Sequence, residues 1–430
     1  MKVCIAPVNF KGITKPYKNK EGYFVIPISV NPTQEDIDKA ISATTKNESH
    51  NGLNGRAYFY GEDLVVKKYM SREEACNFSQ DREINALDLM YENGIKNDNI
   101  QEGKFAFRDA NGGIYLVSTK VDGNGIIPKT NDLNEKNLMQ LMGLFAYLDT
   151  PIHFSDSEYS DYKSKHGHNP IFPYRIPMHF DLSNSNIRIN ENKSGLIDFE
   201  YLELYDCAYL YESMNYTKPL ETICDISDIP GITSNVRGFE YRTLINYVLK
   251  LDKSDRKPFY INYLKIKSHY HELMSANYKK LYNHNSKSIN NDEKMELLNI
   301  SQRHKIHAKL LKNPSDDIIK AEAMKIQISN FIYTQSPFSR KSENKININE
   351  ILLYLNNANR FFDEMYNNAS NENEKIYWED CIKLGKMFNN VINWIAYQIK
   401  FDYVKNPAEQ ELFINKLTNE HIETLDESVC

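Results

Sequence analysis

The chain has 430 residues, of which 41% are hydrophobic, which is enough for one large domain or for two to three ordinary domains with a buried core. It carries 52 lysine and arginine residues against 58 aspartate and glutamate residues, and this formal net charge of −6 argues against a general nucleic-acid binder, which needs a basic excess to neutralise phosphates. No run approaches the roughly 18 apolar residues of a membrane span, and residues 1–10 lack the apolar core of a secretory signal, so we expect a cytoplasmic protein, with export by a dedicated secretion system left open.

The cysteines are widely spaced and form no Cys-x-x-Cys pair, which would be typical of a zinc or redox site. We therefore expect free thiols at all six positions, which are Cys4, Cys76, Cys207, Cys224, Cys381 and Cys430.

The N-terminal segment, residues 1–44, contains one strand and one helix pattern. Residues 23–30 have strand character, but Pro27 confines them to an edge position or ends the pairing there. Thr33 is followed by Asp36 ahead of an apolar run, which is typical of a helix N-cap. The sequence assigns no function to this segment.

Residues 51–69 predict a strand, a tight turn and a second strand. Gly52 and Gly55 lie in the turn before the first strand, a spacing that also occurs in ordinary hairpin loops. The second strand ends in Val-Val-Lys-Lys, and the alternation of side chains along a strand separates Lys67 from Lys68. We single out Lys67 because it alternates with Val65 and Tyr69.

A helix is expected over residues 73–92, with Gly94 as its C-terminal stop. Glu83 shares the apolar face of that helix with Leu87 and Met90, so its carboxylate would point toward the sheet and need a cationic partner. Lys67 is the obvious partner. The alternative is that Glu83 lies at the margin of the apolar stripe and is solvated.

Two further strands, residues 104–108 and 114–121, are joined by a glycine-containing hairpin turn. We expect a boundary between two parts of the fold near residue 122, where the second of these strands ends. Residues 133–148 have the apolar spacing of a core helix, whereas the polar stretch 155–173 is expected to be a solvated loop. The pair His166 and His168 suggests a metal site only weakly, because no third ligand is close in sequence.

The most informative stretch runs from His179 to Tyr201. Asp181 follows the histidine by two residues and Asn186 follows Asp181 by five, ahead of a short β-rich run, a polar turn and Leu-Ile-Asp198. The pattern predicts a β-hairpin that carries three hydrophilic side chains at fixed spacing within apolar flanks. The alternative is a hairpin with a solvated turn and two capping Asp or Asn residues.

This stretch resembles kinase-like phosphotransferases. The motif Leu-Ile-Asp-Phe-Glu-Tyr at residues 196–201 is more similar to that of choline/ethanolamine kinases and aminoglycoside phosphotransferases than to that of protein kinases. Typical protein kinases have arginine where this chain has Phe180 and glycine where it has Glu200. The resemblance extends over residues 50–205 and fades through the C-terminal half.

The resemblance implies a role for each candidate residue. Asp181 would accept the proton of the attacking hydroxyl, while Asn186 and Asp198 would hold Mg²⁺ on the ATP phosphates. The glycine loop would cover the phosphates, Lys67 and Glu83 would form the pair that holds them, and backbone groups around Ser118 to Lys120 would meet the adenine. The implied nucleotide-binding residues are therefore Gly52, Gly55, Lys67, Glu83, Ser118 and Lys120.

The resemblance also implies an aspartate that caps a helix and supports the catalytic loop, a role that Asp206 would fill. Residues 239–251 predict a helix, and residues 283–292 are typical of a linker. Helices are expected at residues 351–365 and 378–403. In choline kinases, C-terminal aromatic residues close the acceptor pocket by cation–π contact, a role that Trp378, Trp394 and Tyr397 would fill by analogy. The alternative is that they pack in a core.

These observations predict an α+β, two-lobed protein-kinase-like fold with an α-helical C-terminal extension. The expected parts are an N-terminal segment at 1–44, a small lobe at 45–122, a large lobe at 123–282 and a helical region at 293–430. The implied activity is ATP- and Mg²⁺-dependent transfer of the γ-phosphoryl group to a hydroxyl of a small amino-alcohol or sugar-like acceptor. The alternatives are a protein kinase or bacterial kinase-like effector that docks proteins through the C-terminal helices, a nucleotide-binding scaffold, or a related transfer such as nucleotidylation.

Overall fold

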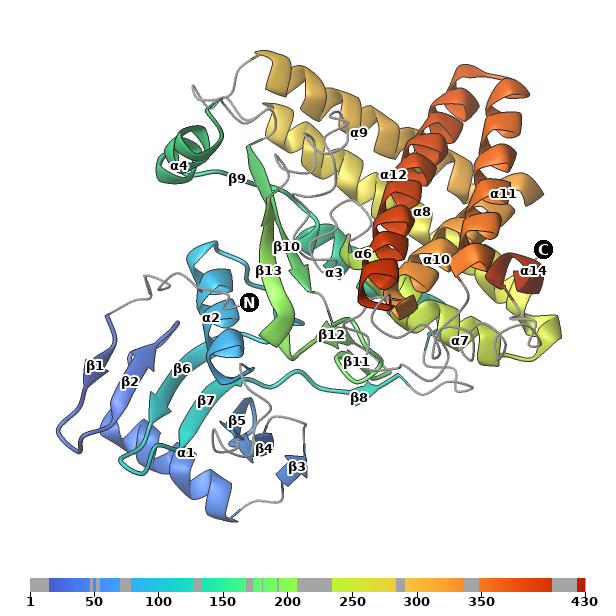
Figure 1. The fold of residues 1–430 in the computed structure, drawn as a ribbon. Helices are drawn as coiled ribbons and strands as arrows, with labels where there is room; N and C mark the ends of the chain where they lie inside the picture. Colours follow the sequence, from blue (N-terminus) through green and yellow to red (C-terminus); the bar gives the residue numbers. More distant parts are fainter. Residues whose placement is uncertain are drawn as a thin grey trace. The chain divides into compact units, whose positions relative to one another are not determined.

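The fold is mixed α and β in a computed structural model, which describes residues 15–46, 49–51, 55–69, 79–126, 133–167, 173–179, 181–191, 193–206, 234–283, 291–335, 348–403 and 424–429. The chain divides into two compact units (Figure 1). Unit 1 comprises Met1–Ile126 and His179–Leu204, and unit 2 comprises Ile127–Met178 and Tyr205–Cys430. The hairpin at residues 187–196 therefore belongs to the same unit as the N-terminal sheet. The boundaries predicted from the sequence stay predictions.

Unit 1 is built on a seven-stranded antiparallel sheet with the strand order β1-β2-β6-β7-β5-β4-β3. Its strands are β1 (Tyr17–Lys18), β2 (Phe24–Pro27), β3 (Ser49–Asn51), β4 (Gly55–Tyr60), β5 (Leu64–Tyr69), β6 (Gly103–Arg108) and β7 (Ile114–Thr119). β2 ends at Pro27, as the missing N–H of proline predicts.

One face of this sheet is covered by α1 (Gln34–Lys46), whose Ile37, Ala40 and Ala43 belong to a single apolar cluster with alternate residues of the strands. Val66 of β5 points into that cluster. Since side chains alternate along a strand, Lys67 and Tyr69, which lie one and three residues after Val66, point to the other face.

The second helix, α2 (Ser79–Glu92), buries Glu83 together with Ile84, Leu87 and Met90. It contacts β6, where a side chain at Gly103 would meet the Leu87 Cβ at 2.9 Å. The chain leaves the helix through Gly94, whose φ of 67° is a left-handed conformation that favours glycine. The start of the helix predicted at residue 73 lies outside the described residues.

A small three-stranded sheet completes unit 1, with the order β12-β11-β8. β11 (Ile187–Ile189) and β12 (Ser194–Leu196) pair antiparallel, which is the hairpin that the sequence predicts, and β8 (Asn124–Gly125) pairs with β11. A short 3₁₀ turn, η1 (Phe199–Tyr201), follows and packs against α2, and β13 (Leu202–Asp206) comes next.

Unit 2 is mainly helical, with α8 packed against α3 and α9, and α12 packed against α9, α10 and α11. A π-helical turn, Glu240–Leu244, joins α6 to α7. The elements are α3 (Glu135–Leu148), β9 (Ile152–His153), α4 (Asp156–His166), β10 (Tyr174–His179), α6 (Asn235–Phe239), α7 (Ile245–Lys250), α8 (Lys253–Asn283), α9 (Asn291–Lys312), α10 (Asp316–Gln335), α11 (Ile348–Asn367), α12 (Glu372–Tyr403) and α14 (Leu425–Val429).

The prediction of a loop at residues 155–173 was wrong for its first half, which forms α4. The helix starts with a capping box, in which the Ser155 hydroxyl accepts the N–H of Glu158 while the Glu158 carboxylate accepts the N–H of Ser155. The helix ends at Gly167, which has a φ of 76°. The helix was not predicted because α4 is mostly polar and has no apolar stripe at helical spacing. The His166 side chain and His168 lie outside the described residues.

No helix among the described residues is long and apolar enough to cross a membrane. Cys381, which is the one cysteine in the described ranges, is a buried free thiol, and burial raises its pKa to about 11.

Candidate functional site

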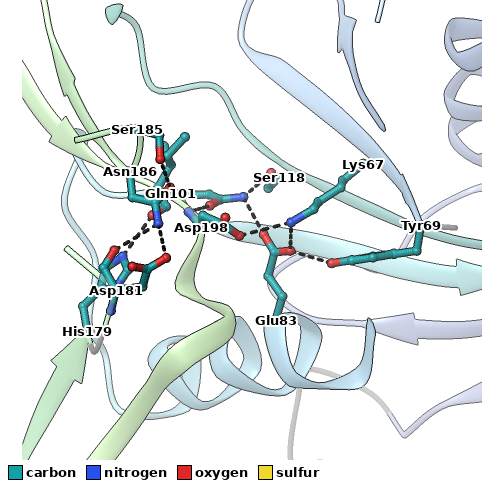
Figure 2. A network of polar contacts seen from close by, with 11 residues as sticks. Lys67, Tyr69, Glu83, Gln101, Ser118, His179, Asp181, Ser185, Asn186 and Asp198 are labelled. Atoms are coloured by element: carbon teal, nitrogen blue, oxygen red, sulfur yellow. Dashed lines mark hydrogen bonds and ion pairs between the residues drawn. The ribbon is translucent and has the colours of Figure 1, made fainter. Parts of the chain in front are cut away.

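The site in unit 1 is centred on Lys67, whose ammonium lies between two carboxylates (Figure 2). Lys67 Nζ is 2.5 Å from Glu83 Oε2 and 3.1 Å from Asp198 Oδ1. The Tyr69 hydroxyl donates a hydrogen bond of 2.7 Å to the same Glu83 oxygen. The strand β5, the helix α2 and the segment after β12 thus meet at one ammonium group.

Burial acts differently on the members of this cluster. Burial alone would lower the Lys67 pKa, but the charges of Glu83 and Asp198 outweigh it and raise that pKa above its ordinary value. Burial, followed by the charge of Glu83, raises the pKa of Tyr69 well above its ordinary value. Lys67 is therefore charged and Tyr69 is a neutral hydrogen-bond donor at neutral pH.

Asp181 and Asn186 are joined directly. The Asn186 amide nitrogen donates to the Asp181 carboxylate and to the Asp181 carbonyl, with both distances 3.0 Å. The Asn186 carbonyl accepts the N–H of Ile197 at 3.0 Å, so the Asp181–Asn186 turn is fixed to the residue before Asp198.

His179 makes a second link to the same residue. Its Nδ1 accepts the N–H of Asp181 at 3.3 Å, so the other ring nitrogen carries the hydrogen and donates to the Ile197 carbonyl at 3.0 Å. The ring also packs on Phe199, with a centroid distance of 4.6 Å. The histidine of the sequence motif therefore orients the turn that carries Asp181.

Asp198 has a backbone conformation that sets it apart. Its φ of 61° and ψ of 62° are left-handed, and no other non-glycine residue in the described ranges has a positive φ. Aspartate tolerates this conformation better than most residues, but it still carries strain, which is typical of functional sites. Arg188, half-buried on β11, is close enough for its charge to interact with Asp198.

The donor set fits a Mg²⁺ ion that is shared with phosphates. Asp198 Oδ2 has no protein partner in the described part of the chain, and Asn186 Oδ1 accepts only a 3.3 Å hydrogen bond from Ser185. Among the described residues, no group of three His, Cys, Asp or Glu residues could hold a metal by itself. Mg²⁺ commonly binds one or two protein ligands and takes the rest of its coordination from water and substrate phosphates.

The structure brings Lys67, Glu83, Asp181, Asn186 and Asp198 into one network, but it places the other predicted residues differently. Gly52 lies outside the described residues, as does Phe180. Gly55 begins β4 so close to β5 that a Cβ there would lie 2.6 Å from the Lys68 carbonyl, so its glycine is explained by packing. Glu200 is buried in η1.

Ser118 and Lys120 do not reach out as nucleotide ligands through their side chains. The Ser118 hydroxyl is buried and accepts a hydrogen bond from Gln101, whereas the Lys120 ammonium is 2.7 Å from Asp122. The N–H of Lys120 donates to the Asp63 carbonyl at 2.7 Å, and the N–H of Thr119 donates to Glu102. These two amides are already used within the protein, so a base contact here would depend on carbonyl groups.

Sequence reasoning missed Gln101 altogether. Its amide lies among Glu83, Ser118 and Asp198 (Figure 2), with one hydrogen bond to each. A single glutamine before a strand carries no motif, and its partner Asp198 is 97 residues away in sequence. The Tyr69 hydroxyl was also missed as a partner of Glu83, although the alternation along β5 places Tyr69 on the face of Lys67.

The proposed acceptor residues in the C-terminal region are described only in part. Trp378 is buried within unit 2 and packs edge-on against Phe361 and Tyr377, so it belongs to a core. The side chains of Trp394, Tyr397 and Asp206 lie outside the described residues; Asp206 itself is the last residue of β13.

Comparisons with known proteins add little. No protein-family model matches the chain, and no curated protein matches it. Among solved structures, it is similar to an ethanolamine kinase of Plasmodium vivax, with 12% sequence identity over 61% of this chain and 81% of that chain, and with a TM-score of 0.26. A TM-score this low carries no weight, so the function has to be argued from the geometry of the site.

Proposed function

We propose that this protein is a kinase-like phosphotransferase that moves the γ-phosphoryl group of ATP to a hydroxyl group in the presence of Mg²⁺. The observation that carries the proposal is the position of Lys67, paired with a helix carboxylate, Glu83, on one side and with Asp198 on the other. Phosphotransferases of this class need a strand lysine paired with a helix glutamate and a metal-binding aspartate near the same phosphates. The proposal includes the two-lobed fold predicted from the sequence.

Each residue then has a role that follows from its contacts. Asp181 accepts the proton of the acceptor hydroxyl, whose oxygen forms the new bond to the γ-phosphorus while the bond to the β–γ bridging oxygen breaks and ADP leaves. Lys67 holds the phosphates, and Glu83 and Tyr69 hold Lys67. Asn186 and Asp198 would hold Mg²⁺, which when bound neutralises charge on the phosphate oxygens.

The acceptor is the less constrained part of the proposal. A small amino-alcohol or sugar-like molecule is the first candidate, because the motif at residues 196–201 resembles that of small-molecule kinases. A protein acceptor that docks through the C-terminal helices is the second, and the buried position of Trp378 favours it, because that ring packs in a core of unit 2. The complete set of Lys67, Asp181, Asn186 and Asp198 argues against an inactive scaffold.

The test is incubation of the protein with γ-labelled or α-labelled ATP and a cell extract, followed by separation of small molecules from proteins. We expect only the γ label to be transferred, and its destination identifies the acceptor class. Asp198→Ala should reduce turnover by about 100- to 1,000-fold while leaving the fold intact, because the side chain is partly exposed at the site. Transfer of the α label would indicate nucleotidylation, and unchanged turnover in the variant would refute the site.

A further inference from the structure

The backbone of Gln101 is fixed against the catalytic hairpin. Its N–H donates to the Leu196 carbonyl at 3.0 Å, and the Leu196 N–H donates to the Asn99 carbonyl at 2.9 Å, so the two segments pair around Leu196. Gly195 makes the approach feasible, because a Cβ there would lie 2.7 Å from the Asn99 oxygen. This pairing places Ile100 opposite Leu196, so Gln101 follows immediately after the paired residue and Asp198 lies two positions after Leu196.

Both ends of the Gln101 amide are occupied. Its Oε1 accepts the N–H of Asp198 at 2.8 Å, and its Nε2 donates to Ser118 Oγ at 3.0 Å and, more weakly, to Glu83 Oε1 at 3.4 Å. The residue is only 8% exposed, so the packed surroundings keep the amide in this orientation. One side chain therefore contacts both of the residues whose carboxylates flank Lys67.

The hydrogen bond from Asp198 to Gln101 is made at a residue with a strained backbone conformation. Asp198 has a left-handed backbone conformation, and such a conformation persists when the surrounding contacts hold it, here including a hydrogen bond from its N–H to an acceptor. Gln101 supplies that acceptor from outside the hairpin. Because the backbone of Asp198 sets the direction in which its side chain leaves the chain, the Gln101 hydrogen bond also constrains the position of the Asp198 carboxylate.

We propose that Gln101 is a positioning residue for metal binding, an inference that rests on the proposed function. Gln101 fixes the backbone of Asp198 so that one carboxylate oxygen meets Lys67 and the other is left for Mg²⁺. Its contact with Glu83 keeps the Lys67–Glu83 ion pair in position beside the Asp198 carboxylate. Gln101 would not touch the nucleotide, so its loss should weaken metal binding without removing the groups that bind ATP.

The test uses Gln101→Met, which preserves the length of the side chain and removes the amide. Gln327→Met is the matched control, because Gln327 is also buried and its Oε1 accepts a distant backbone N–H, that of Leu425 at 2.9 Å, within unit 2. Calorimetric titration of Mn²⁺ into the full chain with a non-hydrolysable ATP analogue reports metal affinity independently of turnover. We expect metal affinity to fall about 10- to 100-fold in Gln101→Met, as is typical for residues that orient metal ligands, and to stay unchanged in Gln327→Met.

The outcomes separate this inference from the proposed function. If the wild-type protein binds neither the analogue nor Mn²⁺ with it, the proposed function is wrong and this inference falls with it. If the wild type binds both and Gln101→Met keeps wild-type metal affinity, only the role of Gln101 is overturned. Should Gln101→Met fail to fold, Ser118→Ala decides, since it frees the other end of the amide and should weaken metal affinity in the same direction by a smaller factor.

Discussion

Each unit of this protein holds a lysine between two carboxylates, and the two clusters differ in what surrounds them. In unit 1, Lys67 lies 2.5 Å from Glu83 and 3.1 Å from Asp198. In unit 2, Lys267 lies 2.6 Å from Glu240 and 2.9 Å from Glu322, with nearly the same geometry. A lysine between two carboxylates is therefore not in itself a sign of function in this chain.

The carboxylates of the cluster in unit 2 are buried and paired within the protein, although a small pocket adjoins the cluster and is lined by Arg237 as well. Lys325 forms a second ion pair with Glu322, so two lysines face two glutamates, and tyrosine hydroxyls donate to both carboxylates, Tyr263 to Glu240 and Tyr377 to Glu322. The Glu322 side chain is 1% exposed. Burial acts to raise its pKa, but the charges of Lys267 and Lys325 outweigh burial and hold that pKa well below its usual range.

The cluster in unit 1 is open on one side and has an excess of negative charge among its direct contacts. Lys67 faces two carboxylates, and the Asp198 side chain is 34% exposed, with one oxygen that has no protein partner among the described residues. A partly exposed carboxylate oxygen without a protein partner can bind a cation, whereas the two glutamates of the unit 2 cluster are buried and held by lysines and tyrosines. The exposure of Asp198, together with the carboxylate oxygen that no described residue binds, thus distinguishes the candidate site from a structural ion cluster.

The largest expected difference follows from removing the central lysine of each cluster. Lys267→Met should lower the free energy of unfolding of unit 2 by about 3–5 kcal/mol, because Glu240 and Glu322 would be left buried with less compensation. Lys67→Met should cost less stability, because Asp198 can turn to water, but it should abolish ATP turnover. Hydrogen exchange of amides in each unit of the full chain measures the two stabilities separately.

The opposite effects of the two substitutions would contradict the assignment of a structural role to the unit 2 cluster and a functional role to the unit 1 cluster. If Lys67→Met unfolded unit 1 while Lys267→Met left unit 2 intact, the open cluster would be the structural one. If Lys267→Met abolished turnover without loss of stability, the unit 2 cluster would be part of the catalytic machinery.

The sequence revealed the open cluster because its residues obey local rules. Lys67 is selected by alternation along a strand and Glu83 by helical spacing, and the three hydrophilic positions of the hairpin stand at fixed intervals. Each of these rules uses only the residues that lie close to the candidate in the sequence. Such reasoning assigns a side chain to a face of its element, and here it pointed to the correct face for Lys67 and for Glu83.

Contacts between distant segments were not accessible in this way. Gln101 meets Asp198 only because the chain before β6 pairs with β12, a register that no local pattern encodes. The unit 2 cluster, which joins the π-helical turn to α8 and α10, was missed for the same reason. In contrast, α4 was predictable, because Ser155 followed three residues later by Glu158 is a capping-box signature that the polar composition obscured.

A smaller difference is expected from the tyrosines, which cap the two clusters alike. The hydroxyl of Tyr69 donates to Glu83 at 2.7 Å and that of Tyr377 donates to Glu322 at 2.8 Å. Tyr69→Phe and Tyr377→Phe should each lower the stability of their own unit by about 1.5–3 kcal/mol, the range for a hydrogen bond to a charged group. Only Tyr69→Phe should also raise the KM for ATP, since Glu83 holds Lys67. Equal KM values in the two variants would remove Tyr69 from the site.

The smallest effect concerns neutral histidines in unit 2. The ring nitrogens of His271 and His304 are 2.8 Å apart, an arrangement in which one nitrogen must donate and the other accept. Burial, with the charge of His307 as a second cause, lowers the pKa of His304 to about 3 from an ordinary value of 6.5. Since the unfolded chain takes up the proton at the higher pH, the stabilising contribution is complete above pH 6.5 and is lost as the pH falls toward 3.

The direction of this pH dependence can be tested against that of His153, a histidine of the same unit whose pKa is shifted in the opposite direction. His304→Gln should remove about 1.4 kcal/mol of the stability that the wild type loses between about pH 7.5 and 5.5, as one pKa unit corresponds to that free energy. The Glu293 carboxylate, 3.5 Å from His153 Nε2, raises the pKa of His153, so the stabilising contribution of His153 is present at low pH and is lost as the pH rises. His153→Gln should therefore steepen the loss on acidification. If both variants changed the slope in the same direction, the neutral state of His304 in the folded protein would be wrong.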